Sequence, residues 1–167
     1  LKLDNMILAF VKGWTPPEFS DEGRDSFLKV ALWAAHVAHG DPERLWLTGF
    51  SWAGHASFDT ALHRPGRLRG IAPVGGGPRR VHFRLLPHLA GVDTVICCGG
   101  RDDPELVWNL REVANRAQAL NFSCALTIDP EEGHTLPLAG FDKISAHIIE
   151  TPAQPAVLAA SGSILAD

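Results

Sequence analysis

Residues 47–55, with the sequence LTGFSWAGH, decide the fold because they join an apolar run to a helical pattern through a single serine. The run that leads into them, RLWLTGF, predicts a buried strand. The residues after the serine predict a helix that continues to about Leu62 and is stopped by Pro65 and Gly66. Ser51, at the junction, is then either an ordinary helix cap or a hydroxyl held out for chemistry.

The same alternation of apolar runs and helical patterns extends along the chain. Strands are expected at residues 6–11, 44–50, 70–77, 93–98 and 124–129, and helices at residues 20–38, 51–62, 104–120 and 138–149. Residues 78–91 fit either a short helix or a loop. Strands that alternate with helices form a parallel sheet covered on both faces. The sequence therefore predicts an α/β fold, with a mostly parallel sheet of about five strands flanked by helices.

The domain organisation is simple. We expect one domain over residues 1–150, followed by a flexible tail, rich in Pro and Ala, over residues 151–167. Of the 167 residues, 46% are hydrophobic and 20% are charged, which is typical of a globular protein with a sizeable core. The net charge of -4 gives no reason to expect a nucleic acid or a membrane surface as partner. No apolar run is long enough to cross a bilayer.

The cysteines argue against both disulfides and metal binding. There are three, Cys97, Cys98 and Cys124, and two of them are adjacent. An odd number with this spacing does not form a disulfide framework and favours a reducing compartment such as the cytoplasm. No Cys-x-x-Cys or His-x-x-x-His cluster surrounds them, so we predict no metal and no organic cofactor.

The turn around Ser51 has the arrangement of a nucleophile elbow, in which a sharp strand-to-helix turn holds a serine at the carboxyl edge of the sheet. The residues two before and two after the serine must be small, and here they are Gly49 and Ala53. Alanine departs mildly from the glycine that is common at the second position. The N–H of Trp52 lies at the helix N-terminus, where it can stabilise an oxyanion.

A serine hydroxyl needs a base to accept its proton, and the base needs a carboxylate to orient it. In this architecture the acid and then the histidine follow the serine along the chain. His134 comes after the last strand and Gly133 frees its loop, so we predict His134 as the base. The other histidines precede the acid, lie on or near the helix after Ser51, or lie within a predicted helix: His36, His39, His55, His63, His82, His88 and His147.

Two carboxylates compete for the role of the acid. Asp102 and Asp103 both follow the strand at residues 93–98. Asp103 directly precedes Pro104, which suits a helix cap with proline at the first helical position. We therefore predict Asp102 as the acid and keep Asp103 as a possible substitute.

These residues together resemble the α/β-hydrolase superfamily, and within it the branch of esterases, polyhydroxybutyrate depolymerase-like enzymes and predicted peptidases. DPERLWLTGFSWAGHASFDTALHRPGRLRGIAPVGGG is similar to that group's stretch through the elbow, and DPEEGHTLP to its closing Gly-His loop. CCGGRDDPELV resembles its His-Gly-x-x-Asp-Asp segment, which implies Asp102 as the triad acid and puts Cys98 where the family has histidine.

One departure from the family concerns the start of the chain. The family has about three strands before the one that resembles residues 6–11, and the loop after its third strand supplies a second oxyanion donor. We therefore expect an N-terminally truncated chain, or fragment, that lacks the first strands; the stretch FVKGW, with Gly13, could imitate that loop.

The function expected from the sequence is that of a serine hydrolase that acts on a small-molecule or polymeric carboxylic ester, with amides as poorer substrates. Ser51, Asp102 and His134 would form the triad, and Trp52 the oxyanion donor. The alternative is a non-catalytic or truncated hydrolase-like domain that serves as a binding module. In that case an exposed sheet edge would favour self-association.

Overall fold

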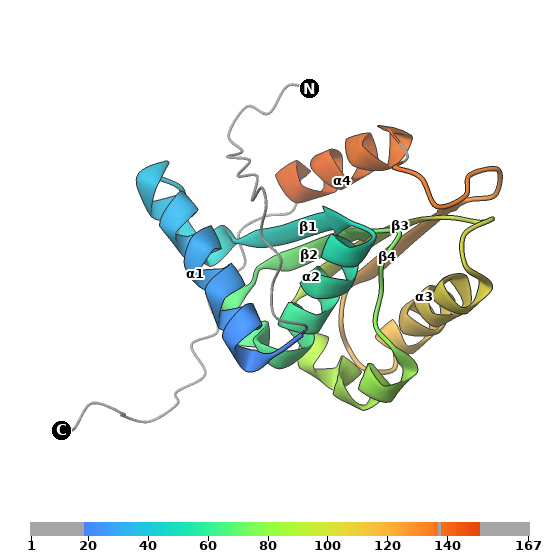
Figure 1. The fold of residues 1–167 in the computed structure, drawn as a ribbon, viewed down its shortest axis with the longest axis horizontal. Coiled ribbons are helices and arrows are strands. Elements are labelled where there is room, and N and C mark those ends of the chain that lie inside the picture. Colours follow the sequence, from blue (N-terminus) through green and yellow to red (C-terminus); the bar gives the residue numbers. More distant parts are fainter. Residues whose placement is uncertain (1–18, 137, 151–167) are drawn as a thin grey trace.

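A computed structural model describes residues 19–136 and 138–150 of the chain. Four parallel strands form one sheet in the order β1-β2-β3-β4 (Figure 1). Their bounds are β1 Trp46–Phe50, β2 Gly70–Val74, β3 Asp93–Gly99 and β4 Cys124–Asp129. The predicted α/β class with a parallel sheet is confirmed. The strand expected at residues 6–11 and the tail expected at residues 151–167 lie outside the described residues.

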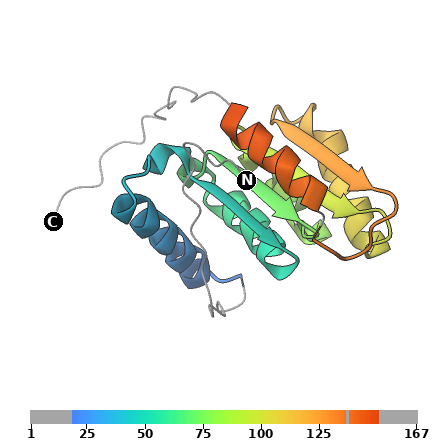
Figure 2. The same ribbon diagram turned by 90° about the horizontal axis from the view of Figure 1, so that it is seen from above.

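Helices cover both faces of the sheet. They are α1 Asp21–Val37, α2 Trp52–His63, α3 Pro104–Ala117 and α4 Leu138–Glu150, with 3₁₀ segments η1 Pro42–Arg44, η2 Pro65–Arg67 and η3 Arg80–Leu89. Figure 2 shows α4 across one face of the sheet and α2 and α3 on the opposite face, with α1 beside α2 past the β1 edge. Residues 78–91, for which the sequence fits either a short helix or a loop, contain the 3₁₀ segment η3. Within the described residues, no helix is long and apolar enough to cross a membrane.

Local chemistry sets where the helices begin. The Ser20 hydroxyl accepts a hydrogen bond from the N–H of Gly23 at 3.1 Å, which caps α1 as the sequence predicts. Asp103 caps α3 in the same way, with Pro104 at the first helical position. The strand predicted at residues 70–77 is shorter than expected, because Gly75 turns the chain with a φ of +55° directly after Val74.

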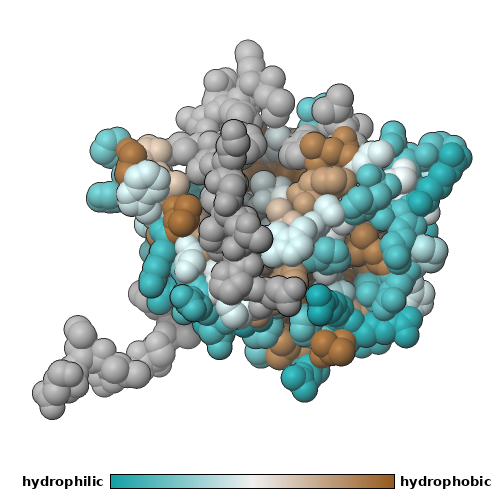
Figure 3. All heavy atoms as spheres, viewed as in Figure 1, coloured by the Kyte–Doolittle hydropathy of each residue, from teal (hydrophilic) through white to brown (hydrophobic). Residues whose placement is uncertain are grey.

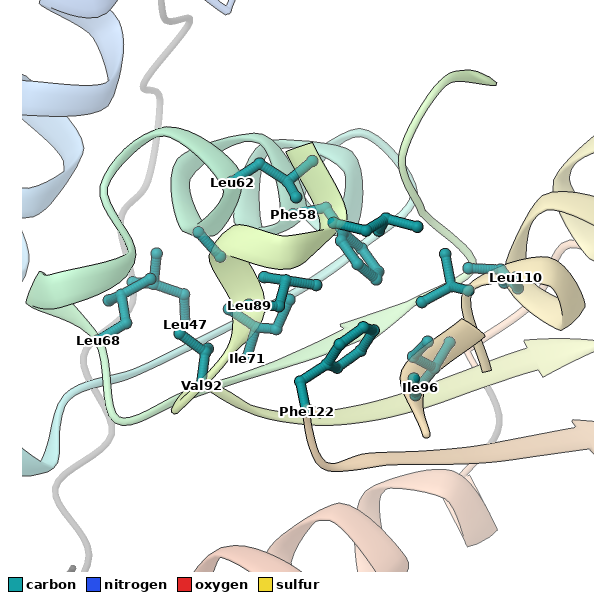
Figure 4. Packing of buried hydrophobic residues seen from close by; sticks show 14 of the residues in the cluster. Leu47, Phe58, Leu62, Leu68, Ile71, Leu89, Val92, Ile96, Leu110 and Phe122 are labelled. Atoms are coloured by element: carbon teal, nitrogen blue, oxygen red, sulfur yellow. The ribbon is translucent and has the colours of Figure 1, made fainter. Parts of the chain in front are cut away.

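The main core lies between the sheet and the layer of α2, α3 and η3. Figure 4 shows its side chains converging from α2 and from the strands below it. The largest of these are fully buried: Phe58, Leu62, Ile71, Leu86, Leu89, Ile96 and Leu110. A smaller core forms on the other face, where Ile144 of α4 packs against Val74, Val95 and Cys97. Every residue of β2 and β3 is buried, whereas β1 and β4 are partly exposed.

An ion pair fixes α1 to α2 at the side of the core. Asp59 of α2 is 3% exposed, and both of its carboxylate oxygens accept hydrogen bonds from the guanidinium of Arg24, at 2.5 and 3.1 Å. A buried carboxylate needs such a partner because isolated charge is costly away from water. The negative charge of Asp59 is therefore balanced by the positive charge of Arg24.

The visible surface has no large apolar face among the described residues. On the side shown in Figure 3, hydrophobic residues lie in small groups separated by hydrophilic ones. The exposed large hydrophobic side chains come from several different elements: Trp33, Val37, Trp52, Val81, Trp108, Leu136 and Ile149. Such scattered exposure is normal for a globular protein.

Because all four strands are parallel, their carboxyl ends meet at one edge of the sheet. The chain leaves β1 at Phe50, β3 at Gly99 and β4 at Asp129, so the loops that follow these strands are neighbours there. Ser51, Asp102 and His134 belong to these three loops.

Candidate active site

Ser51 stands in a turn that its backbone can hold only under strain. Its φ is 56° and its ψ is −116°, a combination that is typical of glycine at the first central position of a type II′ turn. The turn is held from both sides, because the N–H of Ser51 donates to Val74 O at 2.8 Å and Ser51 O accepts from the N–H of His55 at 3.0 Å. The Ser51 side chain makes no capping hydrogen bond to α2, so the interpretation as an ordinary cap is wrong.

The close approach of strand and helix explains why position 49 is glycine. A Cβ on Gly49 would lie 2.4 Å from the Cβ of Ala53. The alanine at position 53 is therefore accommodated because position 49 has no side chain. The loop after β2 approaches just as closely, since a Cβ on Gly76 would lie 2.5 Å from Ser51 O. These contacts direct the Ser51 side chain away from α2 and toward the loops at the edge of the sheet.

His134 reaches Ser51 from the far side of the sheet. Its Nε2 lies 2.8 Å from Ser51 Oγ, and its Nδ1 lies 3.0 and 2.9 Å from the two carboxylate oxygens of Asp102. A carboxylate can only accept, so Nδ1 carries the proton, and Nε2 is free to accept the hydroxyl proton of Ser51. The three side chains therefore form one continuous line of hydrogen bonds across the ends of β1, β3 and β4.

The two neighbouring aspartates have different surroundings. Asp102 is 8% exposed, and its Oδ1 also accepts a hydrogen bond from the N–H of Asp103 at 2.7 Å. The carboxylate of Asp103 accepts from the N–H groups of Glu105 and Leu106 at 2.7 and 3.2 Å. The structure therefore brings Asp102 to His134 and places Asp103, the possible substitute, at the cap of α3.

Cys98 lies below the Asp102 carboxylate. Its Sγ is 3.8 Å from Asp102 Oδ2 and the residue is buried. Burial, with the neighbouring negative charge of Asp102, raises the pKa of the Cys98 thiol to about 12. Cys98 is therefore a neutral thiol near pH 7, and its S–H is a weak donor toward the carboxylate.

Phe50 supports the imidazole and was not identified from the sequence. The rings of Phe50 and His134 have centroids 4.9 Å apart and planes tilted by 36°. A Cβ on Gly75 would lie 3.1 Å from the Phe50 ring and 3.5 Å from His134 Cε1, so the pair leaves no room for a side chain there. The only signal for this contact in the sequence is that Phe50 directly precedes the serine.

Trp52 occupies the first position of α2, where backbone N–H groups have no partner within the helix. Its side chain is exposed, and its ring centroid lies 5.7 Å from that of Phe19. Gly13, the other donor considered from the sequence, lies outside the described residues.

Four other histidines of the described residues make their contacts elsewhere. His55 Nδ1 lies 2.6 Å from Gly77 O, His63 Nδ1 lies 2.8 Å from Asp59 O, and His88 Nδ1 lies 2.8 Å from Leu62 O. His147 faces the ring of Trp46. In residues 19–136 and 138–150, no group of three or more His, Cys, Asp or Glu side chains is arranged to hold a metal ion.

A cavity of about 280 Å³ lies beside the first turns of α2. Its lining comes from α2, from the loop after β2, from the start of η3 and from the residue before the cap of α1: Phe19, Trp52, His55, Asp59, Gly77, Pro78, Arg79 and His82. Two of these residues are connected to Ser51: Trp52 follows it directly in the chain, and the N–H of His55 donates to Ser51 O at 3.0 Å.

Comparison with known proteins gives similarity in structure alone. Neither a family model nor a curated protein matches the sequence. Among solved structures, the Bacillus cereus carboxylesterase is 17% identical, with a TM-score of 0.59, over 77% of this chain and 59% of that one. Esterase PE8 is 20% identical, with a TM-score of 0.63, over 78% and 60%. Zea mays acyl-protein thioesterase 2 is 15% identical, with a TM-score of 0.56, over 84% and 69%.

The chain thus spans about three fifths of the length of the first two of these structures. Similarity at this level of sequence identity concerns the fold alone. The chain has the fold of the α/β-hydrolases.

Proposed function

We propose that the chain is a serine hydrolase that acts on carboxylic esters through Ser51, His134 and Asp102. The observation that carries this proposal is the line of hydrogen bonds from Ser51 Oγ through the imidazole to the buried carboxylate, at 2.8, 3.0 and 2.9 Å. The strained backbone of Ser51 supports it, since strain of this kind is concentrated at functional sites. The similar structures named as a carboxylesterase, an esterase and a thioesterase support the same reaction class.

In the proposed mechanism, Ser51 Oγ attacks the ester carbonyl while His134 Nε2 takes the hydroxyl proton. The carbonyl oxygen becomes an oxyanion, to which the N–H of Trp52 donates a hydrogen bond. When the bond to the alcohol breaks, His134 returns the proton to the leaving oxygen. A water molecule then attacks the acyl-enzyme with the same help from His134, and releases the acid and free Ser51. Asp102 keeps the imidazole in the tautomer with its proton on Nδ1.

The test combines a chromogenic ester with a serine-directed phosphonate. The wild type should hydrolyse 4-nitrophenyl butyrate and take up one phosphonate per chain. Ser51→Ala should lose about 10⁴-fold or more in kcat and should not be labelled. Ser57→Ala is the matched control, because Ser57 lies on the same helix with its hydroxyl donating to Ala53 O at 2.8 Å, away from the imidazole. Full activity and labelling in Ser51→Ala would refute the assignment.

The same titration distinguishes an enzyme from a binding module. A monomer labelled once per chain supports the hydrolase. A chain that associates with itself and takes up no phosphonate would support the non-catalytic alternative. Within the described residues β1 and β4 are the edges of the sheet, so association would use one of them. Size measured by light scattering alongside the labelling reaction gives the answer.

A further inference from the structure

Part of the lining of the cavity beside α2 comes from the first turn of that helix, directly after the proposed nucleophile. His55, one turn after Ser51, binds Ser51 O through its backbone N–H and contacts Gly77 through its ring. Trp52, which directly follows Ser51 in the chain, also lines the cavity. For an ester held at Ser51, this cavity is a candidate space for one of its two arms.

Arg79 gives the cavity a positive charge that the described part of the chain leaves without a counter-ion. The Arg79 guanidinium lies over the ring of Phe19, 5.4 Å from its centroid, and no carboxylate of the described residues pairs with it. The carboxylate that lines the cavity, Asp59, is already held by both hydrogen bonds from Arg24. The net charge of the lining is therefore set by Arg79.

The two histidines add neutral polar groups. Burial lowers the pKa of His82, and the nearby positive charges add to this effect while Asp59 opposes it, so the imidazole is uncharged near pH 7. His55 has its Nδ1 at Gly77 and is half-buried. Aromatic walls from Phe19 and Trp52, one cation and polar ring nitrogens suit a short, partly apolar arm that ends in an anion.

We propose that this cavity selects esters that carry a carboxylate, and that Arg79 binds that carboxylate. The proposal rests on the proposed ester hydrolysis at Ser51. Arg79 is a specificity-determining residue in this view and takes no part in bond cleavage. Its guanidinium can bind a carboxylate through two parallel hydrogen bonds, which a neutral ester arm cannot accept in the same way.

The neighbouring Arg80 provides a matched control. Its guanidinium lies 4.2 Å from the ring centroid of Trp108, on α3, and Arg80 does not line the cavity. Removing the charge at position 79 or at position 80 changes the net charge of the protein equally. A difference between the two variants therefore reports on the cavity and not on long-range attraction between the protein and an anionic substrate.

The experiment compares two pairs of esters that differ in one carboxylate. Mono-(4-nitrophenyl) adipate against 4-nitrophenyl hexanoate places the charge on the acyl arm. 4-Acetoxybenzoate against its methyl ester places it on the alcohol arm. We expect the wild type to prefer the charged member of one pair by about tenfold in kcat/KM, since the contact is charge-assisted and partly exposed to water. The preference should decline between 0.05 and 0.5 M salt.

Arg79→Gln should remove this preference by lowering kcat/KM for the charged ester about tenfold. Arg79→Lys should restore part of it, and Arg80→Gln should retain it. Equal rates for both members of each pair in the wild type, or an unchanged preference in Arg79→Gln, would overturn the proposal. In either case activity on the neutral esters keeps the proposed function intact, whereas a wild type that cleaves none of the four esters contradicts the proposed function itself.

Discussion

Replacement of Ser51 by glycine should stabilise the fold relative to replacement by alanine. Both variants lose the hydroxyl and its hydrogen bond to His134, so their difference isolates the backbone. With φ at 56° and ψ at −116°, the strain on a residue with a Cβ is about 2–3 kcal/mol. Glycine escapes this strain but loses about 1 kcal/mol more in chain entropy on folding. The expected gain is therefore about 1–2 kcal/mol in the free energy of unfolding.

The measurement is urea unfolding of the two variants side by side, with thermal melting as a second readout. For a chain of this size, the gain corresponds to a Tm about 2–8 °C higher for Ser51→Gly than for Ser51→Ala. Ser57, in the interior of the same helix, supplies a control of opposite sign. There Ser57→Gly should be about 1 kcal/mol less stable than Ser57→Ala.

The reasoning fails if Ser51→Gly is no more stable than Ser51→Ala while the pair at position 57 behaves as expected. Such a result would mean that the turn relaxes once the hydroxyl is gone. The strain at Ser51 would then not belong to the backbone path between β1 and α2.

Two further predictions concern the acid and the thiols. Asp102→Asn should lower kcat by about 10⁴-fold in the ester assay because it favours the wrong imidazole tautomer. Asp103→Asn should change kcat by less than about threefold, since asparagine caps helices equally well. Equal losses in both variants would contradict the assignment of Asp102. Mainly because of burial, the thiols of Cys98 and Cys124 have pKa values of about 12 and about 11, above the ordinary 9.0. As the pH rises, the unfolded chain therefore loses these protons before the folded chain does. The free energy of unfolding should then fall as the pH rises from about 9 toward 11. Urea midpoints at pH 8 and pH 10.5 measure this fall. In Cys98→Ala the fall should be smaller. A fall of the same size in that variant would count against the effect of burial.

The positions of the strands and helices could be predicted from local patterns. Apolar runs of strand length, Ser20 before α1 and the pair Asp103-Pro104 before α3 act through contacts between near neighbours, which a sequence displays directly. The segment at residues 78–91 was ambiguous for the same reason. Its 3₁₀ segment η3 contains Pro87 and is held by Leu86 and Leu89, which pack into the core made by distant elements.

The candidate site could be predicted in part. Chain order and strand ends select Ser51, Asp102 and His134, and the structure brings these side chains into contact. The contact between the rings of Phe50 and His134 could not be predicted, because it depends on the distance between residues on opposite sides of the sheet. The charge left on Arg79 is likewise invisible in sequence, since it depends on Arg24 having already paired with Asp59.

The strands lie in the sheet in the same order in which they are synthesised. β1, with its serine, is synthesised first, and the histidine follows only after β4, at the opposite side of the sheet. Under the proposed mechanism, a nascent or refolding chain holds an inert hydroxyl until its last strand docks. Recovery of ester cleavage during refolding would thus time the completion of the sheet, and would lag behind any signal from the core around Phe58.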